Sequence, residues 1–168
     1  MNCILGKNDE EIQIDTAEEY RQYTLSLAEQ AHHSIDIFSQ DLETEIYNNK
    51  SFEGSVFTLS KKHPNTRIRI LTQDSSVAIQ NGHRLIKLAQ QLTSSVFIHN
   101  PSTKYRDVSA AFMIVDEIGL IHRTVVTTKS YRANVNFKSP RPAAELADFF
   151  NTVWKHSITD PQTRRVYL

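Results

Sequence analysis

Short segments in which apolar and polar residues alternate predict the β-strands of this chain. Residues 34–39 and 67–72 each place isoleucines at every second position, a pattern typical of strands. Residues 95–99 form a third run of this kind. Two further apolar runs, 110–115 and 119–126, are separated by a short turn and predict a β-hairpin.

Apolar residues that recur every three or four positions predict helices between and after these strands. The expected helices cover residues 16–33, 51–62, 74–92 and the segment that follows Pro140. Thr16 and Glu19 have the spacing of a capping box, and Asp74 with Ser75 offers N-cap side chains to the third helix. The last helix has the clearest apolar stripe: Leu146, Phe149, Phe150, Val153 and Trp154.

This order of elements, which ends in a hairpin and a helix, favours an α/β fold, a layered sandwich with a mixed β-sheet flanked by helices. The 168 residues suit one domain, and no internal repeat or linker divides them. We therefore expect a single domain over residues 1–168, with a core at roughly 16–157 and a short C-terminal tail at 158–168 that packs on it.

Composition restricts the setting and the partners of the chain. Lysine and arginine number 19, as do aspartate and glutamate, so no global charge attracts nucleic acid, and such binding would need a local patch. Cys3 is the only cysteine, which rules out an internal disulfide. The first residues lack the pattern of a signal peptide, and no apolar run is long enough to span a bilayer. We expect a cytoplasmic protein without membrane contact.

The hairpin around Asp116 carries a family resemblance. An apolar strand that runs into Asp116 and a turn, followed by Leu120-Ile-His-Arg123, resembles the core hairpin of the phospholipase D superfamily, whose signature is His-x-Lys-x4-Asp. Segments similar to that family in order and spacing lie at 34–39, 67–71, 133–137 and 149–154. The resemblance covers roughly residues 16–157 and implies a phospholipase D-like fold.

The catalytic pair of the signature is absent from this chain. Counting back from Asp116, the histidine position is Ser109 and the lysine position is Ala111. Neither residue can attack phosphorus or neutralise a phosphoryl group, so the resemblance implies a non-catalytic module. Half-domains of this family meet across a two-fold axis, which implies a homodimer. The chain is also similar to the phospholipase D-like region that follows acetyltransferase domains in some bacterial proteins, which suggests regulation of, or docking to, an acetyltransferase partner.

The sequence offers candidate ligand-binding residues at strand ends and in its most basic stretch. Ligands of layered α/β domains collect at strand ends, and the basic stretch from Lys129 to Arg141 is interleaved with aromatic residues. The resulting candidates for a phosphate-bearing ligand or nucleic acid are Asp41, Asp74, His83, Arg84, Asp116, His122, Arg132, Asn134 and Asn136.

Two other interpretations remain open. A divergent phosphodiesterase or nuclease could use His83, His99 or His122 as a relocated base beside Asp116 or Asp74. A purely structural interaction module would instead carry an exposed apolar patch for a protein partner. His99 and His122 with a carboxylate lack the spacing of a metal site, so we expect no metal and no cofactor.

Overall fold

The computed structural model of the chain describes residues 2–127 and 130–163. Its centre is an eight-stranded sheet in the order β1-β7-β6-β5-β2-β3-β4-β8. The strands are β1 Ile12–Ile14, β2 Ser34–Ser39, β3 Arg67–Thr72, β4 Val96–Asn100, β5 Ala111–Val115, β6 Gly119–Arg123, β7 Ala133–Asn136 and β8 Ile158–Thr159. β2, β3 and β4 run parallel, whereas the other neighbouring strands pair antiparallel, which makes the sheet mixed as predicted.

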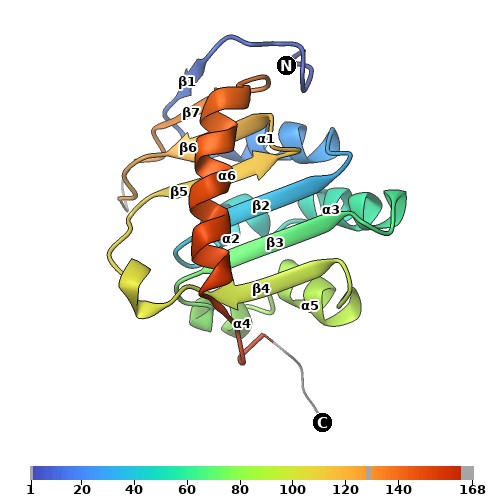
Figure 1. Ribbon diagram of the computed structural model, residues 1–168, viewed down its shortest axis with the longest axis vertical. Coiled ribbons are helices and arrows are strands. Elements are labelled where there is room, and N and C mark those ends of the chain that lie inside the picture. Colours follow the sequence, from blue (N-terminus) through green and yellow to red (C-terminus); the bar gives the residue numbers. More distant parts are fainter. Residues whose placement is uncertain (1, 128–129, 164–168) are drawn as a thin grey trace.

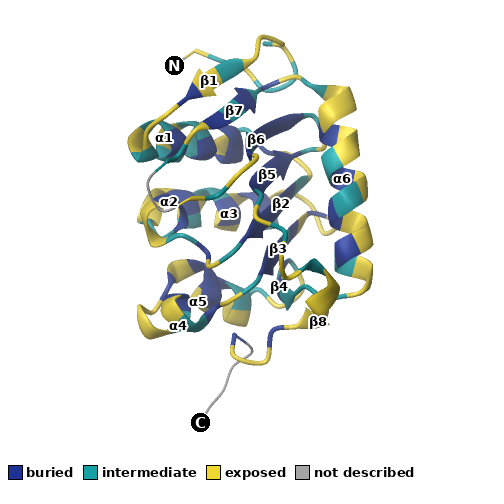
Figure 2. Ribbon diagram, turned by 90° about the vertical axis from the view of Figure 1, so that its left-hand side faces the viewer, coloured by how far each residue is buried: buried dark blue, intermediate teal, exposed yellow. Residues whose placement is uncertain are grey.

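Helices cover the two faces of this sheet unequally (Figure 2). One face carries α1 Ala17–Glu29, α2 Thr44–Tyr47, α3 Lys50–Lys62, α4 Ser76–Gln80 and α5 Arg84–Gln91. The other face is crossed by α6, Pro140–Lys155, which leaves the first residues of β3 and β4 uncovered on that side (Figure 1). A 3-10 turn, Thr103–Tyr105, connects β4 to β5.

Alternation along the strands supplies a separate core to each layer. On β3, Ile68 and Ile70 pack toward α1, α3 and α5, whereas Leu71 packs with Phe38 and Phe112 beneath α6. Residues that point to opposite faces alternate along a strand, so one strand serves both cores. The same alternation turns Arg67 and Arg69 toward the α6 side.

The sequence located most elements, and three differences are informative. The strands at 34–39 and 67–72 and the capping box of α1 are confirmed. The single helix expected over residues 74–92 is wrong: Gly82 adopts a φ of +61°, and His83 caps the new helix α5. The first helix ends at Glu29 and the second hairpin strand at Arg123, both earlier than expected. No helix among the described residues is long and apolar enough to cross a membrane.

Candidate functional site: an acidic cavity at the strand ends

The sheet topology brings three strand ends to one edge. β2 is antiparallel to β5, and β5 is antiparallel to β6, so the end of β2, the start of β5 and the end of β6 meet there. A cavity of about 370 Å³ lies at this edge. Its lining residues are Gln40, Asp41, Glu43, Thr44, Glu45, Ala111, Arg123, Val126, Thr127 and Tyr131.

The positions that correspond to the signature pair offer no catalytic group to this cavity. Ala111, at the lysine position, is buried and presents only a methyl group. Ser109, at the histidine position, lies in the preceding loop, where its backbone carbonyl accepts a hydrogen bond from the N–H of Val126 at 2.9 Å. A methyl group and a loop serine supply neither a nucleophilic imidazole nor an ammonium.

Among the residues that the structure describes, Arg123 is the only cation that lines the cavity, and it is paired with a carboxylate. Its guanidinium is buried and donates to the carboxylate of Glu43 at 2.7 Å. It also donates to the carbonyls of Thr127 and Ser130 at 2.6 and 2.8 Å, and it lies 4.3 Å from the ring centre of Tyr131. These contacts hold the loop after β6 against the loop after β2, so the pair has an evident structural role.

The remaining charge of the cavity is negative. Asp41, Glu43 and Glu45 line it against the single guanidinium. Loss of hydration raises the pKa of Glu43 above its ordinary value, and the nearby Arg123 opposes that rise. Desolvation also raises the pKa of Asp41, and the negative charge of the neighbouring Asp74 adds to this rise. A phosphate dianion would meet repulsion here rather than a preformed anion site.

His83 does not line this cavity, but it contacts the backbone of the loop that does. The imidazole is fully buried, and its Nε2 lies 3.1 Å from the carbonyl oxygen of Leu42, which adopts a φ of +56°. Its Nδ1 accepts from the N–H of Leu85 at 3.1 Å. Burial lowers the pKa of His83 to about 4, so the ring is neutral at pH 7. It fixes the backbone between Asp41 and Glu43.

Asp116 lies at the opposite end of β5 and has a structural role. Its carboxylate accepts from the backbone N–H groups of His32, His33 and Ser34, with the shortest distance at 2.7 Å. This ties the β5–β6 turn to the start of β2. Asp116, counted as the aspartate of the signature, therefore acts as a clamp on the fold.

The other sequence candidates are dispersed. Asp74 is exposed and accepts from the N–H of Ser76, and Arg84 is paired with Glu53 at 3.1 Å. His122 points to the α6 side, with its ring 5.9 Å from that of Phe112. The candidates on or beside β7 stand apart from the cavity: Arg132 near Asp15, Asn134 opposite Gln13, and Asn136 donating to the carbonyl of Asp9. Lys129 and the tail residues Val166, Tyr167 and Leu168 lie outside the described residues.

Among the described residues, no hydrogen bond joins His83, His99 or His122 to a carboxylate. His83 contacts backbone groups, and His99 Nδ1 lies 2.8 Å from the hydroxyl of Ser157. Among the residues that the structure describes, no three histidine, cysteine, aspartate or glutamate side chains gather as metal ligands would.

Sequence reasoning missed the two residues that define the cavity, Arg123 and Glu43. Their pairing joins positions eighty residues apart, which no local pattern reveals. An arginine that ends an otherwise apolar strand was the available signal, because buried arginines require a partner.

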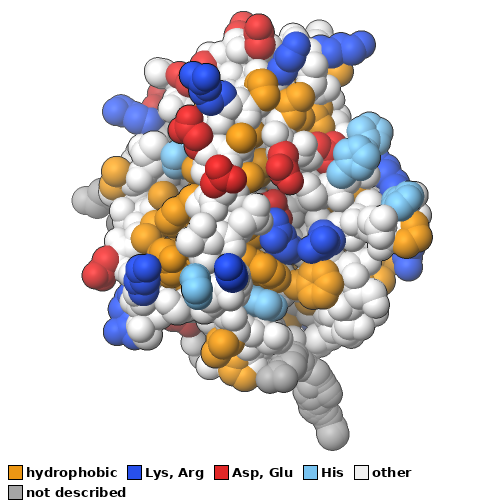
Figure 3. Space-filling view, in the orientation of Figure 1, with side chains coloured by type: hydrophobic (Ala, Val, Ile, Leu, Met, Phe, Trp, Pro, Cys, Tyr) orange, Lys and Arg blue, Asp and Glu red, His pale blue; other side chains and the backbone are white. Residues whose placement is uncertain are grey.

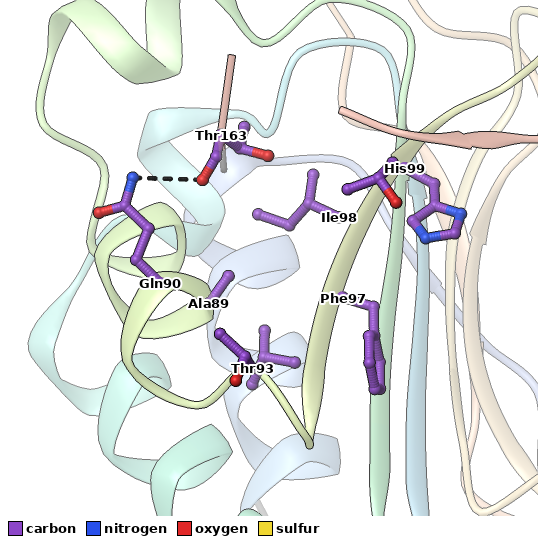
Figure 4. A pocket seen from close by; sticks show the side chains of 9 residues that line it. Ala89, Gln90, Thr93, Phe97, Ile98, His99 and Thr163 are labelled. Atoms are coloured by element: carbon purple, nitrogen blue, oxygen red, sulfur yellow. Dashed lines mark hydrogen bonds between the residues drawn. The ribbon is translucent and has the colours of Figure 1, made fainter. Parts of the chain in front are cut away.

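A second hollow, of about 560 Å³ and mostly apolar, lies between α5 and β4 (Figure 4). Ala89, Ile98 and Phe97 contribute to it, and Gln90 donates to the carbonyl of Thr163 at its rim. Among the described residues its lining carries no carboxylate, lysine or arginine, and His99 is the one titratable side chain there.

Comparison with known families and structures places the chain. A family model described as a domain of unknown function, DUF7931, matches residues 16–166. The chain belongs to the DUF7931 family. No curated protein sequence matches it.

Solved structures resemble this DUF7931 domain in fold at low sequence identity. Nuc from Salmonella typhimurium, a phospholipase D family member, has a TM-score of 0.62 at 15% identity, and the match covers 93% of this chain and 100% of Nuc. NucT from Helicobacter pylori has a TM-score of 0.58 at 6% identity, with coverages of 90% and 100%. The phospholipase D-like fold is thereby confirmed.

An archaeal chromatin protein shares the same fold over part of its length. TrmBL2, described as showing a novel mode of DNA binding, has a TM-score of 0.66 at 14% identity, and the match covers 90% of this chain. The DUF7931 chain spans about half of that protein, 54% of its length. At such identities the likeness shows the fold and no more.

Proposed function

We propose that this DUF7931 chain is a phospholipase D-like domain that does not hydrolyse phosphodiesters and acts by binding. The observation that carries this proposal is the charge of the cavity at the strand ends. Among the described lining residues, three are carboxylates and one is an arginine paired with one of them, at the place where phospholipase D chemistry needs an imidazole nucleophile and cations around the phosphoryl group.

This cavity lacks two features that phosphodiester hydrolysis requires. A nucleophile is lacking, because Ala111 and Ser109 stand at the signature positions. Transition-state stabilisation is lacking too, because charge that develops on phosphoryl oxygens needs preorganised donors, whereas Nη1 and Nη2 of Arg123 already donate to Glu43 and two carbonyls and its Nε is buried. Restoring one of the two features would leave the other missing.

A turnover assay tests the proposal. Purified protein is incubated with bis(p-nitrophenyl) phosphate and with a labelled oligonucleotide, alongside the variants His122→Ala and His83→Ala and a matched control at the exposed His32, His32→Ala. We expect product at the level of the buffer blank for every protein. Turnover that survives in the His32 variant but disappears in either of the others would establish the divergent phosphodiesterase instead.

The resemblance to the phospholipase D superfamily also implies assembly, and we propose that the chain forms a homodimer. We further propose an acetyltransferase as its partner. The two edge strands are short, three residues in β1 and two in β8, so edge-to-edge pairing would bury little. Light scattering coupled to size exclusion measures the molar mass directly. A mass that stays at one chain over a wide concentration range would remove the homodimer from the account.

A further inference from the structure

The α6 side of the sheet holds a polar hollow at the start of β3, whereas the strand-end cavity lies at the other end of the parallel strands. The hollow has a volume of about 500 Å³, and it lies beside α6 over the first residues of β3 and β4. Lysine and arginine side chains lie beside hydrophobic and histidine side chains over these strands (Figure 3). The lining combines arginine, aromatic and small polar residues, chiefly Arg67, Arg69, Phe97, His99, Trp154 and Asn65.

The strand register explains why these side chains share one surface. Arg69 on β3 stands opposite Phe97 on β4, and Arg67 and His99 are two positions away on the same face. His99 stacks on Trp154 from α6 with a centroid distance of 3.8 Å and an interplanar angle of 10°. The result is an aromatic wall beside two guanidinium groups.

The two arginines differ in whether a carboxylate neutralises their charge. Arg69 donates to Asp36 at 2.9 and 3.2 Å and to Asn151 at 2.8 Å, and its guanidinium lies 4.9 Å from the ring centre of Phe150. Arg67 is exposed and forms no ion pair with any described residue. No carboxylate lines this hollow in the described part of the chain, so its unneutralised charge is that of Arg67.

We propose that this hollow binds a nucleotide unit, a nucleobase together with its phosphate. The base lies against Phe97 and the edge of the His99–Trp154 stack, and the phosphate meets Arg67. Aromatic faces beside cations are the means by which proteins hold unpaired bases without reading sequence. The hollow has the size of a small-molecule site, and its charge complements the ligand, whereas the strand-end cavity repels phosphate.

This inference rests on the proposed binding function and names its ligand class and location. Its failure is distinguishable from failure of that function. Turnover of a phosphodiester would refute the non-catalytic proposal and leave the binding result intact, and absence of nucleotide binding would refute this inference without touching the turnover result.

Trp154 is the sole tryptophan of the chain, so its fluorescence reports on this hollow alone. The full chain is titrated at low salt with thymidine, with thymidine monophosphate and with a short oligothymidylate, and excess inorganic phosphate serves as competitor. We expect saturable quenching by the two phosphate-bearing ligands and much weaker quenching by thymidine. Equal affinity of monophosphate and oligomer identifies a free nucleotide as the source, and tighter oligomer binding identifies single-stranded nucleic acid.

Three variants locate the contacts. Phe97→Leu keeps apolar volume but removes the ring and is expected to weaken binding roughly fivefold to a hundredfold, the range of one base stacked on one aromatic side chain. Arg67→Gln is expected to reduce the salt dependence of oligomer binding by about 0.7 in the log–log slope, the value for one phosphate of a single strand. Arg132→Gln, at an exposed arginine of the basic stretch, tests that stretch as the competing location of the ligand and should bind like the wild type.

Several results would overturn the proposal. They are the absence of saturable quenching, quenching equal in the Phe97 and Arg67 variants and the wild type, or loss of binding in the Arg132 variant alone, which would place the ligand on the basic stretch. A dimer in the absence of nucleotide that Phe97→Leu dissociates would show that a second copy of the chain covers this face instead.

Discussion

Replacing Arg123 with methionine tests whether the acidic cavity is held together by its buried ion pair. The guanidinium side chain is 2% exposed and the Glu43 side chain 14%, so the substitution leaves a poorly hydrated carboxylate without its partner. Breaking a buried pair in this way costs about 3–5 kcal/mol. For a chain of this length, that corresponds to a fall in the melting temperature of roughly 6–20 °C.

Urea denaturation at pH 7 followed by fluorescence measures the loss, with two further proteins as references. The exposed pair Arg84–Glu53 provides a matched control, and Arg84→Met should cost no more than about 1 kcal/mol. The double variant Arg123→Met with Glu43→Met removes both charges and should recover most of the stability, since apolar replacements of buried pairs are often neutral. A loss below about 1 kcal/mol in Arg123→Met, or a double variant no more stable than the single one, would refute the reasoning.

The pH dependence of the same variant has a definite sign. Burial already raises the pKa of Glu43 above 4.5, and removal of Arg123 deletes two of the three interactions that lower it, leaving only the hydrogen bond with Tyr131. A carboxyl whose folded pKa is raised stabilises the fold only while it is protonated. The loss of the two carbonyl contacts of Arg123 is present at every pH, so the deficit of Arg123→Met relative to the wild type should be smallest below pH 4.5 and grow as the pH rises through the raised value.

Three further predictions concern residues that hold the fold together. Because the folded pKa of His83 is about 4 against an ordinary value of 6.5, its contribution to stability is complete above pH 6.5 and is lost as the pH falls toward 4. The free energy of unfolding should decrease by about 2 kcal/mol from pH 7.5 to 5. Urea denaturation of His83→Asn across that range should show a flatter dependence of stability on pH. A profile unchanged by the substitution would show that His83 is not the titrating group. Asp116→Ala should cost about 1–3 kcal/mol by urea denaturation, because three backbone N–H groups lose their acceptor, whereas the exposed Asp148→Ala should be near neutral; equal effects would contradict the clamp. Gly119→Ala would place Cβ 2.5 Å from a methyl of Leu5 and should lower the free energy of unfolding by roughly 1–3 kcal/mol; a wild-type denaturation midpoint would show that Leu5 moves aside freely.

The regular elements were predictable because each depends on a local pattern. The alternation at residues 34–39 and 67–72 gave the bounds of β2 and β3, and the stripe after Pro140 gave α6. The break at Gly82, which adopts a φ of +61°, escaped because the apolar stripe continues through it. The contact of His83 with Leu42 gave no local signal either, because it joins residues forty-one positions apart.

The site was predictable in its position and not in its character. The rule that ligands gather at strand ends led to Asp41, which does line the cavity. It could not reveal that Glu43 neutralises Arg123, nor that Phe97, His99 and Trp154 converge from two separate elements. Both facts depend on sheet order and register, which alternation alone does not determine.

The account depends most on one claim, that the cavity at the strand ends no longer accepts a phosphoryl group. Amide chemical shifts recorded by NMR during titration with inorganic phosphate test it residue by residue. We predict that Gln40, Thr44 and Thr127 keep their shifts while residues around Arg67 respond. Saturable shifts at the first three, lost in Arg123→Met, would show that the cavity still holds phosphate and would contradict the account.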